Sequence, residues 1–326
     1  MRRGLEASRP ADEIYEDQTF VTLLDAEAQP ASSSTQPSVM AAKLEALDLS
    51  PGQRVLEIGT GTGYNAALLA QLVGETGCVV TVELEQELVE IAALRLTSLG
   101  LTQVRVRCAD GWLGSPSCAP YDRVIATASC ESVPLAWRKQ LATGGILVMN
   151  LVSRDHILSV LVRLVKQADG TLSGVTLPTG ASFMGLRSAM PSDRSWMTER
   201  ADLEGTQRME IAPHLRHSLR HDRTLLFYLH AQMPGLSHRM QYRDGLRNSA
   251  TSYDLCYHGD DFLLVVREGE ALGRGDVTPL ISACQRWEER GHPDPGSYQV
   301  AIDEDGRPRF RLQEPAQSSQ EKRSHS

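Results

Sequence analysis

The sequence has few aromatic residues and no long apolar run, although its composition is that of a folded protein. Aromatic residues make up 5% of the 326 residues, hydrophobic residues 41% and charged residues 23%. The longest apolar stretches, GGILVMNLV and ILSVLVRLV, are far shorter than the roughly twenty residues that cross a bilayer. The arginines near the N-terminus have no apolar run behind them, so no secretory signal is expected. We therefore expect a cytoplasmic protein that does not bind a membrane.

The chain also lacks an excess of positive charge and any C-x-x-C pair. Its net charge of -8 and isoelectric point near 5.6 argue against a general nucleic-acid binder, which needs a basic face to displace counterions. The six cysteines are Cys78, Cys108, Cys118, Cys130, Cys256 and Cys284. Most lie in apolar surroundings, so buried reduced thiols are expected in place of disulfides or a metal site.

Short β-branched runs alternate with helical periods between residues 51 and 151. The expected strands are 54–58, 78–83, 104–108, 122–127 and 146–151. The segments between them repeat apolar residues at spacings of three and four, as amphipathic helices do. This alternation predicts an α/β fold, a doubly wound Rossmann-like parallel sheet with helices on both faces.

The pattern changes after residue 153. HILSVLVRLVKQADGTLSGVTL predicts a hairpin that extends the sheet antiparallel at one edge. From about residue 191 a mixed α+β region is expected, with strands at TLLFYLHAQ and DDFLLVVREG and a helix at VTPLISACQRWEERG. A last hairpin is expected around Asp305 and Gly306. We therefore divide the chain into a disordered N-terminus (1–14), an α/β domain (15–188), an accessory or substrate domain (189–314) and a disordered tail (315–326).

The stretch VLEIGTGTGYN places three glycines between an apolar strand and a helix. Gly59, Gly61 and Gly63 lack Cβ atoms, so the backbone can turn sharply and approach a ligand closely. The dinucleotide pattern G-x-G-x-x-G would need a glycine where Tyr64 stands. A ligand without a pyrophosphate is therefore favoured over a nicotinamide cofactor, and an oxidoreductase on this fold remains the weaker alternative.

Two carboxylates follow at the ends of the next two expected strands. In a doubly wound sheet, Glu83 lies beside the glycine loop, where its carboxylate can accept hydrogen bonds from both hydroxyls of a ribose. Asp110 lies at the carboxyl end of the third strand and can accept from the exocyclic amine of an adenine. Together the three strand ends predict an adenosine pocket.

The same segments resemble the protein-L-isoaspartate O-methyltransferases, which are S-adenosyl-L-methionine enzymes. The resemblance covers about Tyr15 to Leu151 and rests on RVLEIGTGTGYNAALLA, VVTVE, CADGWLG, APYDRVIATAS and LATGGILV, in the family's order and spacing. It implies a methyltransferase domain at 15–188 that binds S-adenosyl-L-methionine. The residues it assigns to the cofactor are Glu57, Ile58, Gly59, Thr60, Gly61, Gly63, Asn65, Glu83, Leu84, Asp110 and Gly111.

The polar run PASSSTQPSVM precedes this pocket and reads by composition as a linker. In the family a serine precedes an x-Pro pair here, and its hydroxyl lies near the methyl donor and the accepting carboxylate. Pro37 aligns with the family proline, so the resemblance gives Thr35 this catalytic role, with Ser34 as second candidate. Ser38 is expected to cap the following helix.

The resemblance implies a peptide or protein substrate that carries an aspartate-derived carboxylate, and it leaves two substrates open. One is isoaspartate in damaged proteins. The other is an aspartate of a modified precursor peptide in ribosomal peptide maturation, whose methyl ester closes to a succinimide (aspartimide). The region after residue 191 exceeds the family's usual length and favours the second, while the core motifs favour the first. A binding protein for adenosyl ligands that has lost catalysis is a further alternative.

The C-terminal region contains HLRHSLRH, which places three histidines at helical spacing among arginines. A metal site would need a further carboxylate or cysteine, and none is clearly placed to complete it. We therefore predict no metal. A basic face for an acidic peptide and a plain solvated helix face both stay open.

Overall fold

The computed structural model of the chain describes residues 16–24, 28, 30–153, 158–178, 183–187, 201–233, 235–242 and 253–313. The two segments expected to be disordered, 1–14 and 315–326, lie outside these residues. Within the described part, no helix is both long enough and apolar enough to cross a membrane.

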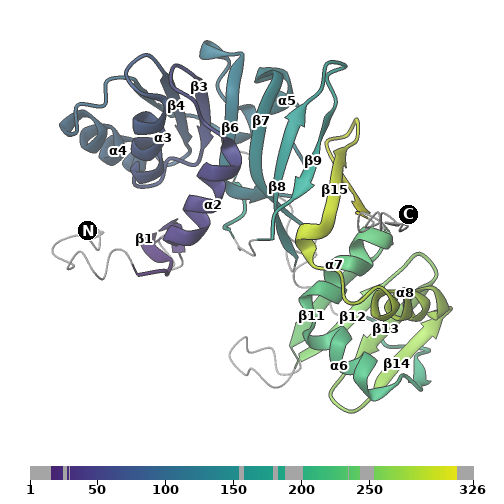
Figure 1. The fold of residues 1–326 in the computed structure, drawn as a ribbon. Coiled ribbons are helices and arrows are strands. Elements are labelled where there is room, and N and C mark those ends of the chain that lie inside the picture. The colour runs from purple at the N-terminus through teal and green to yellow at the C-terminus, as the bar shows by residue number, and fades with distance from the viewer. Residues whose placement is uncertain are drawn as a thin grey trace, which may run out of the picture.

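A nine-stranded sheet forms the centre of the larger domain (Figure 1). Its strands are β3 (Arg54–Ile58), β4 (Cys78–Glu83), β5 (Val104–Cys108), β6 (Tyr121–Cys130), β7 (Leu141–Val152), β8 (Ser159–Lys166), β9 (Leu172–Thr176), β15 (Tyr298–Ile302) and β16 (Pro308–Leu312). The spatial order is β16-β15-β9-β8-β7-β6-β3-β4-β5, parallel from β7 to β5 and antiparallel from β8 onward. The predicted α/β sheet with an antiparallel edge is confirmed, and the first three strands have the predicted bounds.

Helices cover both faces of this sheet. On one face lie α2 (Pro37–Leu47), α3 (Tyr64–Val73) and α4 (Gln86–Ser98), whose buried residues form one cluster with Val55, Val79 and Val148. On the other face lies α5 (Leu135–Gln140), where Trp137 packs with Leu56 and Val80. The short 3₁₀ turns η1 (Gly111–Leu113) and η2 (Pro116–Cys118) connect β5 to β6. A separate two-stranded sheet, β1 (Phe20–Leu24) and β2 (Pro30–Ser34), precedes α2.

The C-terminal region forms a second, smaller sheet with three helices among the described residues, which we refer to as the C-terminal domain (Figure 1). Its five-stranded antiparallel sheet has the order β10-β14-β13-β12-β11. The strands are β10 (Gln207–Met209), β11 (Ser237–Tyr242), β12 (Tyr253–His258), β13 (Phe262–Val266) and β14 (Ala271–Gly275). The helices are α6 (Pro213–His221), α7 (Arg223–Gln232) and α8 (Thr278–Glu289), and η4 (Pro295–Ser297) follows them. The predicted mixed α+β composition is confirmed.

The segment TLLFYLHAQ, expected to be a strand, is helix α7. Asp222 caps its start, because its carboxylate accepts hydrogen bonds from the backbone N–H groups of Thr224 and Leu225 at 2.8 and 3.2 Å. Residues Leu225–Leu229 are all buried, since α7 packs against α8, η4 and β16. A helix buried on several sides has the same continuous apolar sequence as a buried strand.

The last hairpin, β15–β16, returns to the main sheet. β15 pairs antiparallel with β9, and Thr176 donates a hydrogen bond from its hydroxyl to the Tyr298 carbonyl at 3.1 Å. The turn around Asp305 and Gly306 is where it was predicted. The proposed division at residue 188 stays a prediction, and the chain that follows it contributes strands to both sheets.

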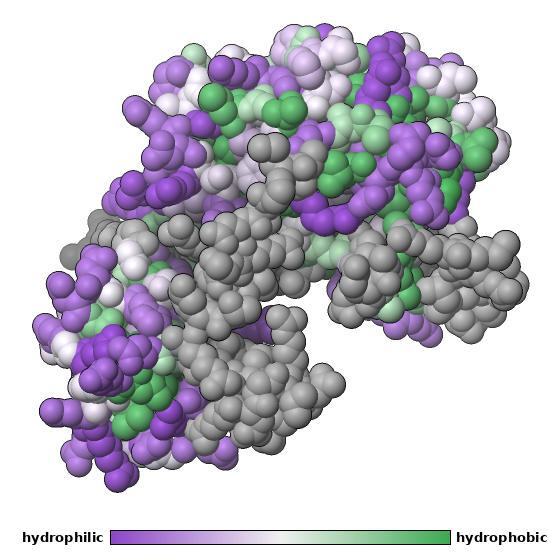
Figure 2. Space-filling view, turned by 180° about the vertical axis from the view of Figure 1, so that it is seen from behind, coloured by the Kyte–Doolittle hydropathy of each residue, from purple (hydrophilic) through white to green (hydrophobic). Residues whose placement is uncertain are grey.

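Hydrophilic side chains and free cysteines occur in both parts of the described chain. Figure 2 shows hydrophilic side chains over much of the rear of both domains, with smaller hydrophobic areas between them. All six cysteines are free. Cys130, Cys256 and Cys284 are buried, but Cys108 is exposed, so the expectation of burial was wrong for this residue.

Candidate functional site

A pocket lies where the parallel strands β3 and β4 end beside β6. Ile58 of β3 is level with Val82 of β4 and with Ala126 of β6, so the loops after β3 and β4 emerge next to Thr127, which lies within β6. The pocket is lined there by the glycine loop, Glu83 and Thr127, and from the other side by the segment 32–36 and by residues 183–187. This is the position at which open α/β sheets bind ligands.

The glycine loop closes tightly against β6. Gly59 has φ +96°, and a Cβ built on it would lie 2.3 Å from Thr127 Oγ1. That hydroxyl donates to the carbonyls of Ile58 and Gly59 at 3.0 and 2.7 Å, so it fastens the loop to the strand. Gly63, at φ +84°, serves packing instead, since its Cβ would lie 3.1 Å from Ala92 on α4.

Glu83 presents a carboxylate that the backbone holds in place. Its Oε2 accepts from the Gly61 N–H at 2.9 Å, and its Oε1 accepts from the Leu84 N–H at 2.8 Å. The side chain is 9% exposed and lines the pocket. Backbone donors fix its direction, and its remaining lone pairs stay available to a ligand's hydroxyl groups.

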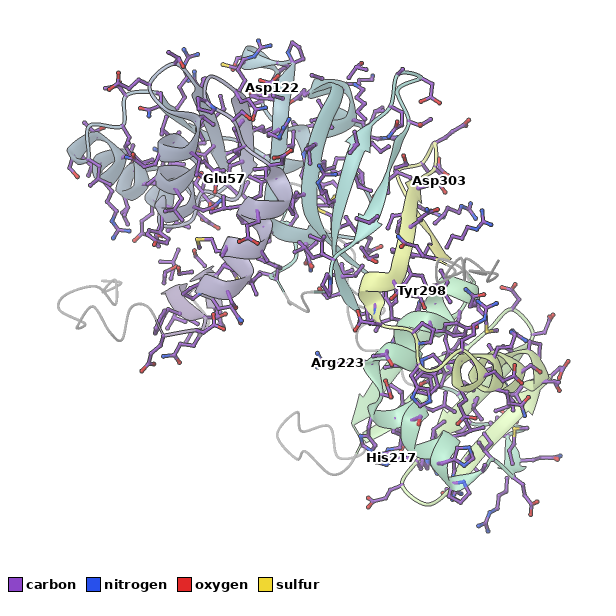
Figure 3. The ribbon with its side chains drawn as sticks, in the orientation of Figure 1. Glu57, Asp122, His217, Arg223, Tyr298 and Asp303 are labelled. Atoms are coloured by element: carbon purple, nitrogen blue, oxygen red, sulfur yellow. The ribbon has the colours of Figure 1, made fainter. Side chains whose placement is uncertain are left out.

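Glu57 lies beneath the pocket at the centre of the main sheet domain (Figure 3). It is fully buried, with Oε1 accepting from Asn65 Nδ2 at 2.7 Å and Oε2 accepting from Thr81 Oγ1 at 2.6 Å. Burial raises the pKa of Glu57 to about 7, against the effect of these hydrogen bonds and of the nearby Lys43. Glu57 therefore supports the pocket from below and does not line it.

Asn65 connects Glu57 to the pocket, because it binds the Glu57 carboxylate and also lines the pocket. The side chain lines the pocket and is 8% exposed. Its Nδ2 is taken up by Glu57, while none of the described residues donates to its buried Oδ1. A buried acceptor without a donor is costly, so Oδ1 is suited to a ligand that brings an N–H group.

Asp110 stabilises the turn after β5, and Gly111 lines the pocket. Asp110 Oδ1 accepts from the Trp112 N–H at 2.9 Å and caps η1. Gly111 is buried and lines the pocket, and its carbonyl accepts from Trp137 Nε1 at 2.8 Å. A Cβ on Gly111 would lie 2.8 Å from Ile58 Cγ2, so a larger residue would push into the pocket floor.

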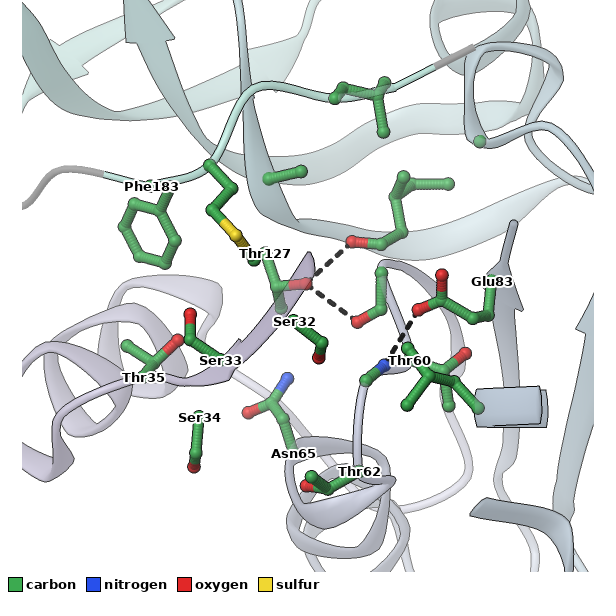
Figure 4. A pocket seen from close by; sticks show the side chains of 18 of the residues that line it. Ser32, Ser33, Ser34, Thr35, Thr60, Thr62, Asn65, Glu83, Thr127 and Phe183 are labelled. Atoms are coloured by element: carbon green, nitrogen blue, oxygen red, sulfur yellow. Dashed lines mark hydrogen bonds between the residues drawn. The ribbon is translucent and has the colours of Figure 1, made fainter. Parts of the chain in front are cut away.

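The polar run lies against the pocket. Ser32 to Ser34 belong to β2, and together with Thr35 they line it. Side chains of a strand alternate, and in Figure 4 Ser33 and Thr35 lie together while Ser34 points away from them. The side chains of Ser33 and Thr35 therefore lie on the same side of this segment.

Ser38 does not cap α2 as expected. The helix begins at Pro37 with Gln36 as N-cap, and Ser38 lies inside the first turn. Its N–H and hydroxyl both donate to the Asp17 carboxylate, at 2.8 and 2.9 Å. These bonds hold the pKa of Asp17 below its ordinary value. Asp17, distant in sequence, thus supplies the acceptor that Ser38 was expected to provide.

Most of the predicted site residues come together. Those that line the pocket are Ser34, Thr35, Ile58, Gly59, Thr60, Gly61, Asn65, Glu83, Leu84 and Gly111. Glu57, Gly63 and Asp110 lie behind this lining and hold it in place.

Two parts of the lining were missed from the sequence. Thr127 ends the expected strand 122–127, so the strand-end rule that selected Glu83 could have found it. Residues 183–187 carry no comparable signal. Three hydrogen bonds to Ser129 hold them at the pocket. Ser129 donates its N–H to the Met184 carbonyl and its hydroxyl to the Phe183 carbonyl, and its own carbonyl accepts from the Leu186 N–H.

The histidine-rich helix lies in the other domain. Figure 3 shows His217 on α6, away from Glu57. His214 contacts Glu288 at 3.2 Å and Arg216 donates to the Gly269 carbonyl at 2.8 Å. Across the described residues no group of three or more His, Cys, Asp or Glu side chains could hold a metal ion.

Comparison with known families places the first half of the chain. A family model described as Protein-L-isoaspartate(D-aspartate) O-methyltransferase (PCMT) matches residues 10–187. The chain is 43% identical over 145 residues to the Protein-L-isoaspartate O-methyltransferase of Thermotoga maritima, covering 44% of this chain and 45% of that protein. It is 44% identical over 142 residues to the protein of the same name from Ignicoccus hospitalis, covering 44% of this chain and 67% of that one. The matched segment thus spans less than half of the Thermotoga protein.

A solved structure is similar over nearly the whole chain. It is titled Protein-L-isoaspartate O-methyltransferase, shares 25% sequence identity, and superposes with a TM-score of 0.59. The alignment covers 95% of this chain and 90% of that one, so it includes the C-terminal domain.

Proposed function

Because the chain belongs to the protein-L-isoaspartate(D-aspartate) O-methyltransferase family, we propose that it is an S-adenosyl-L-methionine-dependent carboxyl O-methyltransferase. The proposed substrate is a protein or peptide with an aspartate-derived carboxylate, and isoaspartate is the leading candidate. The observation that carries the proposal is the pocket at the strand ends, which Glu83, Asn65 and Thr35 all line.

The lining fits S-adenosyl-L-methionine. Glu83 has lone pairs for the two ribose hydroxyls, and Asn65 Oδ1 would accept from the ammonium group of the methionine part. Gly111 would leave room for the adenine beside Ile58. The cofactor supplies an electrophilic methyl group on a sulfonium. The chain's own residues have to place an acceptor beside it.

Thr35 is suited to orient that acceptor. A carboxylate is already ionised and nucleophilic at neutral pH, so it needs positioning more than a general base. The Thr35 hydroxyl can donate to one carboxylate oxygen while the other oxygen faces the methyl group. Because a hydroxyl does not protonate the carboxylate, the nucleophile keeps its charge. Thr35 lies at the end of the pocket opposite Glu83 (Figure 4), where the acceptor would approach.

The substrate within this class stays a proposal. The alternative is an aspartate of a dedicated precursor peptide, whose methyl ester would close to a succinimide. The C-terminal domain no longer favours this alternative, since the solved structure named as a protein-L-isoaspartate O-methyltransferase is covered to 90% of its length. An alternative of another class is a non-catalytic protein that binds adenosyl ligands. We further propose a cytoplasmic location.

Transfer of a labelled methyl group tests the function. The full-length protein is incubated with methyl-labelled S-adenosyl-L-methionine and one of two short peptides that differ only in isoaspartate or aspartate at one position. We expect base-labile methyl ester on the isoaspartyl peptide alone. Ester on neither peptide, with S-adenosylhomocysteine still binding in calorimetry, would support the dedicated-substrate or the non-catalytic alternative. Absence of that binding would contradict the proposal as a whole.

A further inference from the structure

A lysine lies buried beside the pocket, and the chemistry described so far does not use it. Lys43, on α2, is 2% exposed. Its ammonium donates to the Ala126 carbonyl of β6 and lies 4.1 Å from the centre of the Phe183 ring. Phe183 lines the pocket, and Ala126 directly precedes the lining residue Thr127.

A buried ammonium needs compensating partners, and the partners of Lys43 belong to the site. Loss of hydration lowers the pKa of Lys43 to about 7, and the Glu57 carboxylate on β3 opposes this effect. The carbonyl supplies one acceptor, and the aromatic face supplies a second favourable contact for a cation that water does not reach. An uncharged residue of similar length would fill the space without this cost, so packing alone does not account for a lysine.

The contacts of Lys43 join three pieces that form the acceptor end of the pocket. Helix α2 begins two residues after Thr35, and Thr127 of β6, next to Ala126, binds the glycine loop. The segment 183–187 is fastened at its backbone by Ser129, which donates its hydroxyl to the Phe183 carbonyl at 3.0 Å. The ammonium of Lys43 contacts the Phe183 ring itself. In Figure 4 this ring lies at the Thr35 end of the pocket, away from Glu83.

We propose that Lys43 is a positioning residue for the acceptor: its ammonium, between the Ala126 carbonyl and the Phe183 ring, fixes this ring as the wall against which the substrate peptide lies. The inference deepens the proposed methyl transfer and rests on it. It concerns the peptide and not the cofactor, because the ring and the ribose-binding carboxylate stand at opposite ends of the pocket.

The charged neighbours of α2 limit what else could explain a pH effect. Glu57 is the charged group that acts on Lys43. Arg123 and Arg163 also contact α2, but they donate to carbonyls of its last turn, at Leu47 and Ala46. Asp17 contacts its first turn through Ser38. The pKa of Glu57 is also about 7, so Glu57→Gln is measured beside Lys43→Met: a kinetic change near pH 7 belongs to Lys43 where Glu57→Gln retains it.

Steady-state kinetics with the isoaspartyl peptide provide the first test. For Lys43→Met we expect the peptide KM to rise about tenfold, the loss typical of a desolvated cation–π contact, while the Kd for S-adenosylhomocysteine stays within about twofold. Phe183→Leu should give the same pattern, and the double variant should be no worse than either. Lys166→Met is the matched control, because Lys166 also donates to main-chain carbonyls, those of Arg138 and Leu141 at 2.7 Å, away from the pocket.

A pH profile separates positioning from simple packing. As pH rises through about 7, wild-type Lys43 loses its charge, and kcat/KM for the peptide should fall with it. In Lys43→Met this fall should be absent, leaving a low, flatter profile. A profile identical to wild type in the Met variant would overturn the proposal.

Nuclear magnetic resonance tests the geometry without turnover. The sequence has four lysines, so selective labelling of the side-chain Cε gives a simple spectrum, and Lys43→Met assigns the signal. We expect this signal to carry a ring-current shift that Phe183→Leu removes, and to titrate near 7, not near the ordinary value of about 10.4. A signal with ordinary shift and titration would contradict the inference. If the wild-type protein methylates no peptide, the proposed function fails. The spectrum still reports on the contact between Lys43 and Phe183, because it does not depend on turnover.

Discussion

At the scale of single residues, the threonine beside the pocket carries the proposed chemistry through one hydroxyl group. Thr35→Val keeps the shape of the side chain and removes the donor. We expect kcat for methyl transfer to fall about tenfold to a hundredfold, the effect of one hydrogen bond to a charged group. The Kd for S-adenosylhomocysteine should not change. Thr35→Ser, which restores the hydroxyl, should recover most of the rate.

The matched comparison for this prediction is Ser34, the second candidate, which also lines the pocket but points away from Ser33 and Thr35. Ser34→Ala removes a hydroxyl from the same strand without affecting the pair formed by Ser33 and Thr35 (Figure 4). An equal loss in Ser34→Ala and Thr35→Val would show that the whole segment, and not the Thr35 hydroxyl, sets the rate. Methyl-ester formation under saturating peptide measures both variants.

Glu57 should make stability depend on pH in a defined direction. Its folded pKa of about 7 exceeds the ordinary value of 4.5, so the folded protein holds the proton more tightly than the unfolded chain between these values. The free energy of unfolding contributed by this group therefore falls as pH rises from 4.5 to 7. Glu57→Gln should remove this slope. The difference in free energy of unfolding, variant minus wild type, should therefore be more positive at pH 7.5 than at pH 5.

Urea denaturation at pH 5, 6 and 7.5 measures this slope. Glu45→Gln, an exposed carboxylate on the solvent side of α2, is the control and should follow wild type at each pH. The opposite sign, with Glu57→Gln losing stability relative to wild type as pH rises, would contradict the raised pKa. Lys43 also affects the pH dependence of the free energy of unfolding, above pH 7. Its folded pKa of about 7 lies below the ordinary 10.5, so the unfolded chain binds this proton more tightly and stability rises with pH between these values.

Sequence reasoning reached the site wherever a residue follows directly from a strand end. Glu83 and the glycines could be predicted, because parallel strands place their carboxyl ends at one edge and few residue types tolerate the turn that follows. Lys43 and Phe183 could not. Their contact joins a helix to a segment about 140 residues later, and no periodicity in either segment encodes a pair that only the tertiary fold creates.

At the scale of secondary-structure elements, α7 depends on a cap that its apolar sequence conceals. Asp222→Ala removes the acceptor for the Thr224 and Leu225 N–H groups. We expect the free energy of unfolding to fall by about 1 kcal/mol, the usual cost of losing an N-cap. Asp169→Ala is the control, because Asp169 accepts from the N–H and the hydroxyl of Thr171, as Asp222 does from Thr224, in a turn that begins no helix. Equal losses in urea denaturation would show that capping is not what matters at Asp222.

The elements between residues 51 and 151 could be predicted closely, and α7 could not, for one physical reason. β3, β4 and β5 are short runs bounded by turn residues, so length and β-branching decide their type. The run in α7 is as apolar as a strand because η4, α8 and β16 cover it on several sides. Asp222, the residue before this run, is the helix signal that the sequence contains.

At the scale of the whole molecule, the two domains share one hydrophobic core. A single cluster of buried residues extends from Leu56 and Val80 in the main sheet to Phe227, Trp287 and Tyr257 in the C-terminal domain. The turn of the last hairpin adds a backbone contact, where Val133 donates its N–H to the Gly306 carbonyl at 2.7 Å. We therefore expect one cooperative unfolding transition for the full chain.

Gly306→Ala tests the contact between the last hairpin and the chain that follows β6, both parts of the main sheet domain. The substitution would place a Cβ 2.4 Å from the Val133 carbonyl oxygen at φ +84°. Gly170→Ala has nearly the same φ, +86°, with no heavy atom within 4 Å of the new Cβ, so it measures backbone strain alone. We expect Gly306→Ala to lose about 2 kcal/mol more than Gly170→Ala. Thermal unfolding should remain a single transition, and two separate transitions would contradict the shared core.

The position of β15 also sets an order of events during synthesis. β9 ends at Thr176, but its outer neighbour begins only at Tyr298, more than a hundred residues later. A ribosome adds residues from the N-terminus, so β9 remains an unpaired sheet edge while the whole C-terminal domain is translated. The glycine loop, Glu83 and Thr127 have all been synthesised by then. The nascent chain thus contains the residues of the predicted ligand-binding motif before β15 can pair with β9 and complete the main sheet.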